Sequence, residues 1–231
     1  MKALLIARRE LSDLVGDRSF ILGLVFLAVA PLLFVNIGGG TRIPAAVLLV
    51  FAVQSAMFPT FMTANVAAST FIQDKENQTL LPLLAAPISD GQIITGKLLA
   101  IFAPAALGSW LALAIFYVAA SVKFGAALVA SVITAPILYA IVVLSALLVL
   151  TLASWTMVVA SRVRTARSAQ QVAGLIIAAL YGLFAVSAQY LFDAFGGWIF
   201  LALPVAILVA DVAALELARR LWGREEAIAR I

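Results

Sequence analysis

Six long apolar stretches constrain this chain more strongly than any other feature of its sequence. A helix needs roughly 20 apolar residues to cross a hydrocarbon core of about 30 Å. The chain is 65% hydrophobic and 11% charged, whereas a soluble domain is about half apolar and about a quarter charged. We therefore expect one all-α integral membrane domain over residues 1–231, with six transmembrane helices. The expected spans are about 19–37, 44–72, 98–120, 127–160, 172–192 and 198–217.

Two of these stretches are longer than a single crossing requires. At about 1.5 Å per residue, a helix over 127–160 would overshoot the bilayer, so we expect part of 127–135, before Pro136, to lie along the outer surface. The stretch 44–72 also overshoots, and its end near Ile72 is expected to project into the cytoplasm.

The positions of the basic residues predict the orientation of the chain, because lysine and arginine collect on the cytoplasmic side of a membrane. Thirteen of the fifteen flank or join the stretches on one side, and only Arg42 and Lys123 lie on the other. Both termini are therefore expected in the cytoplasm, with short outer connections at 38–43, 121–126 and 193–197. The basic residues form no stripe with interleaved aromatics, so we expect no nucleic-acid partner.

The chain contains no histidine and no cysteine, and this limits its chemistry. These residues supply the usual zinc ligands, the thiol nucleophile and the commonest general base. We therefore expect no catalytic residue and no metal site. Residues 91–97 match G-x-x-x-x-G-K, but Leu98 stands where a phosphate-binding loop needs Ser or Thr, and no strand is expected before it. We expect no nucleotide there, and we expect Lys97 at the level of the lipid headgroups.

Residues 2–18 are predicted to form an amphipathic helix that lies in the membrane interface with its apolar side down. Its apolar face carries Leu4, Ala7, Leu11, Leu14 and Val15, with Ile6 as the exception. Its polar face carries Lys2, Arg9, Glu10, Asp13 and Asp17. This helix is either a surface anchor alone or, in addition, a contact for a cytoplasmic partner.

The cytoplasmic connection 73–97 is the most informative segment. The charged cluster Asp74-Lys75-Glu76 leads into Thr79-Leu80-Leu81-Pro82-Leu83-Leu84, followed by a break at Pro87-Ile88-Ser89-Asp90. A second short helix, capped by Ser89 or Asp90, is expected to run into the third span. An apolar helix face outside the membrane has to be covered, either by this chain's own helices or by another protein.

The D-K-E cluster, the run T-L-x-x-L-L-A-x-P-I-S and the G-K that enters the next span resemble the permease subunits of the type-two ATP-binding-cassette exporters. The six-span layout and the N-terminal interfacial helix extend this resemblance over nearly the whole chain. One departure is that Leu81-Pro82 stands where an acidic residue often follows the threonine-leucine pair, so a salt bridge to the partner is not expected at that point.

The resemblance implies that 73–97 contains a coupling helix, which seats in a groove of a separate ATPase subunit. The residues implied to contact that subunit are Asp74, Lys75, Glu76, Thr79, Leu80, Leu83 and Leu84. It also implies two ATPase copies, which bind ATP and magnesium, and no cofactor on this chain. A second permease subunit, identical or related, would complete the substrate pathway in the lipid of a prokaryotic cytoplasmic membrane.

Polar residues within the spans are candidates for the pathway. Gln54, Phe58, Phe61 and Asn65 share one helix face of the second span, and Tyr181 and Gln189 lie in the fifth. The two amides need partners in hydrocarbon, which are either neighbouring helices or a wet cavity. The resemblance favours the pathway, because spans two and five border it in such exporters.

Asp211 is the one carboxylate well inside an apolar run. It either forms an internal ion pair with Arg219 or Arg220, two turns along the helix, or extends toward the interface in a snorkelling arrangement, or belongs to a proton relay. Other functions compete with the leading one. These are a haem-exporter-type permease of cytochrome c maturation, a membrane enzyme such as a lipid head-group transferase, and a membrane scaffold or passive channel.

Overall fold

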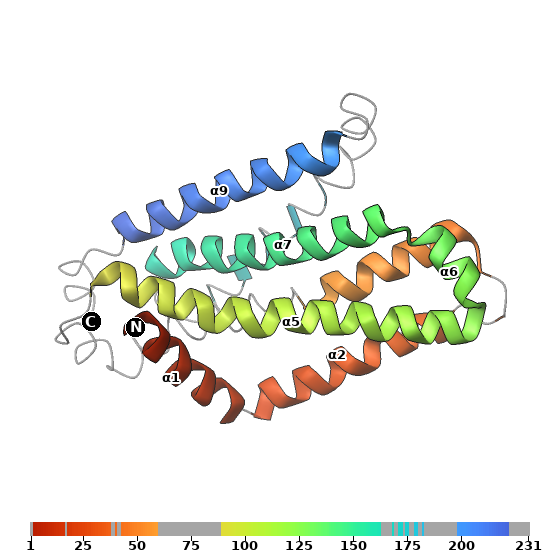
Figure 1. Ribbon diagram of the computed structural model, residues 1–231. Helices are drawn as coiled ribbons and strands as arrows, with labels where there is room; N and C mark the ends of the chain where they lie inside the picture. The colour runs from red at the N-terminus through yellow and green to blue at the C-terminus, as the bar shows by residue number, and fades with distance from the viewer. Residues whose placement is uncertain are drawn as a thin grey trace. The chain divides into compact units, whose positions relative to one another are not determined.

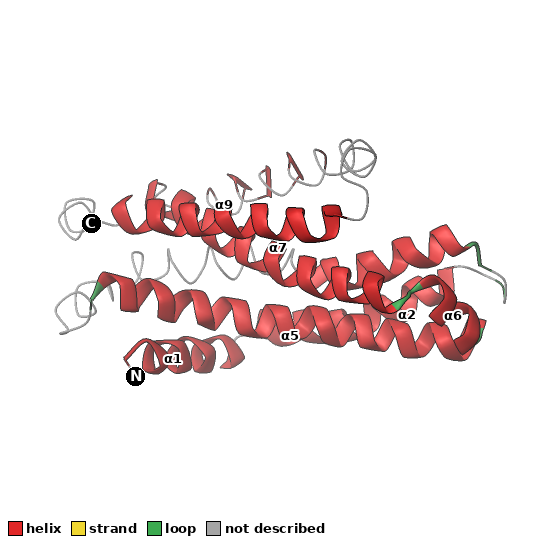
Figure 2. Ribbon diagram, turned by 45° about the horizontal axis from the view of Figure 1, so that its top comes forward, coloured by secondary structure: helices red, strands yellow, loops and turns green. Residues whose placement is uncertain are grey.

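The computed structural model describes the chain as a set of helices. It describes residues 2–16, 18–37, 40, 43–59, 89–162 and 198–221, together with 168, 171–172, 174–175, 178–179 and 182. No strand occurs among these residues (Figures 1 and 2). The helices are α1 (Lys2–Gly16), α2 (Arg18–Ile37), the unlabelled helix Ala45–Pro59, α5 (Asp90–Phe124), α6 (Ala126–Val132), α7 (Ala135–Arg162) and α9 (Ile199–Leu221).

Two helices are long and apolar enough to cross a membrane, over Gly91–Phe124 of α5 and Ala135–Val159 of α7. The helices α2 and α9 coincide with the predicted stretches at 19–37 and 198–217 to within a few residues. Ala45–Pro59 is a shorter apolar helix. Most of the stretch 172–192, and the part of 44–72 beyond Pro59, lie outside the residues that the structure describes.

The expected loop at 121–126 is wrong. The helix α5 has 35 residues and continues through Lys123 to Phe124, and Gly125 alone separates it from α6. Gly125 adopts φ 96° and ψ 132°, a conformation that residues with a Cβ rarely reach. One residue therefore separates α5 from α6, and the connection is shorter than the loop predicted over 121–126.

The predicted division of 127–160 is confirmed. The short helix α6 ends at Val132, and α7 begins at Ala135 as a separate helix. Pro136 is the second residue of α7, within the first turn, where a missing N–H breaks no hydrogen bond. Figure 1 shows α6 as a short segment between the two long helices.

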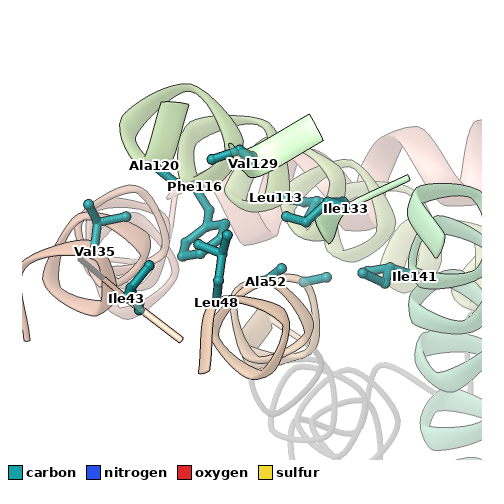
Figure 3. Close-up of a cluster of buried hydrophobic side chains, with 11 residues drawn as sticks. Val35, Ile43, Leu48, Ala52, Leu113, Phe116, Ala120, Val129, Ile133 and Ile141 are labelled. Atoms are coloured by element: carbon teal, nitrogen blue, oxygen red, sulfur yellow. The ribbon is translucent and has the colours of Figure 1, made fainter. Parts of the chain in front are cut away.

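The described residues belong to two compact units, and α1, α5 and α7 contribute to both. The second unit comprises Ser12–Met62 and Ala103–Val149. Its core brings together α2, Ala45–Pro59, α5, α6 and α7, and in Figure 3 Phe116 and Leu48 point toward one another at its centre. Alanines fill much of the remaining core, and such small residues let helix backbones approach closely. The core residues are Val35, Ile43, Leu48, Ala52, Ala56, Leu113, Phe116, Ala120, Val129, Ile133 and Ile141.

The first unit comprises Met1–Leu11, Thr63–Phe102 and Leu150–Ile231. Within it, α1 buries Ile6 and Ala7 and leaves Leu4 exposed. The prediction of α1 as a helix is confirmed. Ile6, which was predicted to lie off the apolar face, is in fact among the buried residues of α1. It is buried beside Ala7, because the helix packs on its own chain along that side.

Candidate functional site

The residues implied to contact an ATPase lie outside the part of the chain that the structure describes. They are Asp74, Lys75, Glu76, Thr79, Leu80, Leu83 and Leu84. The described part of the connection 73–97 begins at Ser89 and runs directly into α5.

Ser89 caps α5, as the sequence predicted. The Gln92 N–H donates to Ser89 Oγ at 3.4 Å, and the Ser89 N–H donates to Gln92 Oε1 at 3.2 Å. This reciprocal pair is a capping box; it satisfies the Ser89 N–H and adds a second acceptor for the Gln92 N–H, which also donates to the Ser89 carbonyl at 2.9 Å. The predicted short helix and the predicted third span are therefore one continuous helix, which fixes the end of the connection to α5.

The residues 91–97 that match the phosphate-loop pattern form the first turns of α5. A phosphate-binding loop requires free backbone N–H groups that converge on the ligand. In α5 the Thr95 hydroxyl instead donates to the Gly91 carbonyl at 2.7 Å, as side chains on a regular helix do. The geometry is that of a helix, so the pattern forms no nucleotide site here.

The sequence predicts Lys97 at the headgroup level with its charge reaching toward water, and the structure instead buries that charge. The Lys97 side chain is fully buried, and its Nζ donates to Glu10 Oε1 of α1 at 3.0 Å. A buried ammonium requires an opposite charge, because removing it from water costs several kcal/mol. Glu10 meets that requirement from 87 positions away in the sequence. The pair joins the N-terminal helix to the first turns of α5, and Figure 1 shows α1 beside that end of α5.

Sequence reasoning missed this pair, although it had two relevant signals. Glu10 lies on the polar face of an amphipathic helix, and Lys97 is the only charged residue between Asp90 and Lys123. A single cation at the start of a long apolar helix calls for a nearby anion, but the pattern does not say which one.

Among the candidate pathway residues, Gln54 and Phe58 are described. Gln54 is exposed, while the next residue, Ser55, is buried and donates to the Phe51 carbonyl at 2.8 Å. Phe58 is half-buried, with its ring centroid 5.1 Å from that of Phe26. Phe61, Asn65, Tyr181 and Gln189 lie outside the described residues.

The exposed face of Ala45–Pro59 includes Val47, Val50 and Gln54, which follow one another at steps of three and four. Of the predicted stripe, this chain therefore leaves Gln54 uncovered and covers Phe58 in part. Lipid covers valine well but offers an amide no hydrogen bond.

No protein-family model matches the chain, and no curated protein matches it.

Asp211 is fully buried on α9. The prediction that it pairs with Arg219 or Arg220 is wrong. Arg219 and Arg220 are exposed and lie 3.8 and 3.0 Å from the oxygens of Glu216. The contact of Asp211 is with Thr151 of α7, whose hydroxyl donates to Asp211 Oδ2 at 3.1 Å. Thr151 carried no signal of its own, because a threonine in an apolar helix commonly bonds its own backbone.

The described residues contain no group of three or more His, Cys, Asp and Glu side chains that could hold a metal ion. Two of the side-chain pairs that they do bring together join different helices, Glu10–Lys97 and Thr151–Asp211, and both lie within the first unit. The first pair links two helices at the end of the connection 73–97. The second pair, Thr151–Asp211, links the apolar segments of α7 and α9.

Proposed function

We propose that this chain is the transmembrane permease subunit of an ATP-driven exporter of the ATP-binding-cassette type. In this proposal it crosses the cytoplasmic membrane of a prokaryote six times, with both termini in the cytoplasm. It forms half of a substrate pathway, and a second permease subunit supplies the other half. Support comes from the two long apolar helices, from the asymmetric distribution of lysine and arginine, and from the motif in 73–97.

The observation that carries the proposal is the continuity of α5. One helix runs from the Ser89 cap to Phe124, a length of about 52 Å at 1.5 Å per residue. This exceeds the thickness of a hydrocarbon core, about 30 Å, so part of α5 has to project beyond it. Pro104 lies inside α5 and removes one hydrogen bond of the helix, so a segment attached to the projecting end would act first on the turns before Pro104.

The Glu10–Lys97 pair extends this coupling to α1. Because Lys97 lies two turns after the Ser89 cap and is ion-paired with Glu10, displacement of the connection would also displace the N-terminal helix. In this proposal the ATPase pushes on the connection 73–97, and both α1 and α5 respond.

The exposed face that carries Gln54 would then line the substrate pathway. An amide within an apolar helix needs water, a substrate or another protein against it, because lipid chains form no hydrogen bond. A pathway between two permease subunits supplies such a surface. Phe58 follows Gln54 on the same face, and the face would continue through Phe61 to Asn65.

ATP and magnesium would be bound by the separate ATPase subunit, in two copies, and this chain would carry out no hydrolysis. The chain's own contribution would be mechanical. It would convert closure of the ATPase pair into a change in the access of the pathway.

Copurification tests this proposal. The tagged chain, solubilised in mild detergent from the membrane of its own host, should bring with it an ATPase of the ATP-binding-cassette type, and the complex should hydrolyse ATP. The double variant Glu76→Lys with Leu80→Asp should insert normally and lose that ATPase. A matched charge reversal on α9, Glu216→Lys, should retain it, because Glu216 lies in exposed ion pairs with Arg219 and Arg220.

The two possible failures have different meanings. Absence of such an ATPase from the wild-type complex contradicts the exporter function. Retention of the ATPase by the double variant contradicts the coupling role of 73–97 alone.

A further inference from the structure

Asp211 occupies an unusual position for an acidic side chain. It lies near the middle of α9, between Ile199 and Leu221, and has no exposed surface. The neighbouring buried residues on the same face of α9 are Ala214 and Ala218. Each is small and apolar, so the face presents one carboxyl group in otherwise apolar packing. The inference concerns this helix face and does not depend on an ATPase partner.

One carboxyl oxygen of Asp211 is satisfied and the other is not. Thr151 Oγ1 donates to Oδ2 at 3.1 Å, whereas Oδ1 is buried with no hydrogen-bond partner. A carboxylate anion distributes its charge over both oxygens and normally accepts several hydrogen bonds. The contact with Thr151 therefore meets only part of what an anion requires.

The helices α7 and α9 place no cation beside Asp211 in the contacts of their described side chains. The one charged residue of α7 is Arg162, at the last position of the helix, about three turns beyond Thr151. On α9 the charged residues are Glu216, Arg219 and Arg220, and both arginines are exposed and pair with Glu216. An unpaired anion buried in such surroundings costs far more than a neutral acid, because low-dielectric packing disfavours the charged form.

We propose that Asp211 is a proton-binding site and that the neutral carboxyl group is the form that packs between α7 and α9. A carboxyl group and a hydroxyl group can each donate or accept, so the contact with Thr151 is kept when the proton is bound. Release of the proton to water would leave one uncompensated negative charge at this packing contact. The site is therefore a hydrogen-bonded clamp that holds α9 on α7 while its proton is present.

The pH dependence of stability tests this proposal, because a neutral Asp211 and a charged Asp211 in the folded protein give stability changes of opposite sign as pH rises. If the folded protein keeps Asp211 neutral, the unfolded chain binds fewer protons at this position at neutral pH. Stability then falls as pH rises above the ordinary value for Asp, about 3.9, until the folded site itself ionises. Asp211→Asn removes this contribution and keeps the shape of the side chain. The melting temperature of the wild type minus that of Asp211→Asn should therefore decrease between about pH 5 and pH 8.

The experiment uses the tryptophan fluorescence of the purified chain in detergent, since the sequence contains four tryptophans. Glu216→Gln is the matched control, because Glu216 is an exposed acid on the same helix. The melting temperature of the wild type minus that of Glu216→Gln should not fall with pH. A difference for Asp211→Asn that rises with pH identifies an anion held by a cation and overturns the proposal. A flat difference overturns it as well.

Infrared spectroscopy of the wild type keeps the test independent of how well the variant folds. A protonated carboxyl group gives a carbonyl stretching band that a carboxylate lacks. We expect this band at neutral pH in protein labelled at aspartate, and we expect it to shift in Thr151→Val, which removes the hydroxyl partner. Absence of the band from the wild type at neutral pH overturns the proposal.

Discussion

Lys97 Nζ lies 3.0 Å from Glu10 Oε1, with the lysine side chain fully buried and the glutamate side chain 17% exposed. The two residues belong to α5 and α1, which are separated by most of the N-terminal half of the chain. Because desolvation of each ion costs several kcal/mol, this pair is stable only while both members are present. The contact therefore fixes the position of α1 on α5.

Glu10→Gln should destabilise the protein by about 3 kcal/mol, which is the range for breaking a buried ion pair by removing one member. The cost arises because Lys97 stays buried with its charge no longer matched by Glu10. The measurement is the midpoint of thermal or denaturant unfolding, followed by tryptophan fluorescence in detergent. The double variant Glu10→Leu with Lys97→Met should recover much of the loss, because apolar replacement of a whole buried pair is often neutral or stabilising.

Glu216→Gln provides the control for this prediction. It breaks ion pairs with Arg219 and Arg220 in which all three side chains are about half exposed or more. Exposed pairs contribute less than about 1 kcal/mol, so its effect should be small. If Glu10→Gln is no more costly than Glu216→Gln, then the Lys97 contact does not fix α1.

Ser89→Ala should weaken the start of α5 by about 1 kcal/mol, the usual cost of removing a capping hydroxyl. Ser89→Asp should have little effect, because aspartate accepts the same backbone hydrogen bond. Amide hydrogen exchange near Gln92 should be faster in the alanine variant. Thr95→Ala is the control, because its exposed hydroxyl bonds only the Gly91 carbonyl of its own helix. Equal acceleration in both variants would argue against the capping box.

Local chemistry explains the parts of the fold that could be predicted from sequence. The start of α5 was predictable because Ser89 is a strong capping residue, and the break before α7 because Pro136 favours the first turn of a helix. The bounds of α2 and α9 followed from their apolar runs. Each of these signals acts within a few residues along the chain.

Tertiary contacts explain the parts that could not be predicted. Lys97 looked like a headgroup anchor because its partner lies in another helix, and Thr151 gave no sign that it would donate to Asp211. Arg219 stands eight positions after Asp211 but only three after Glu216, and helix side chains meet at spacings of three and four, so the arginine pairs with Glu216. Spacing along a helix determines which pairs can form, and burial determines which pair does form.

Gly125→Ala should destabilise the connection between α5 and α6 by about 2 kcal/mol, the typical cost of holding a residue with a Cβ in a sparsely populated backbone region. A Cβ at Gly125 would meet nothing within 4 Å, so the cost comes from its φ of 96° and not from a clash. Gly91→Ala is the matched control. It also meets nothing within 4 Å but lies in a regular helix, so it should stabilise by about 0.5 kcal/mol. Similar unfolding midpoints for the two variants would contradict this account.

Gln54→Cys should react with a water-soluble maleimide in intact membranes if its face lines a wet pathway, because maleimides modify the thiolate and that form requires water. The chain contains no cysteine, so each introduced thiol reports on one position. Leu48→Cys, fully buried on the same helix, and Val209→Cys, exposed on the apolar surface of α9, should both remain unmodified. Equal reaction at positions 54 and 209 would show that exposure alone decides labelling. No reaction at position 54 would mean that protein or lipid covers Gln54, and the pathway would then lie elsewhere.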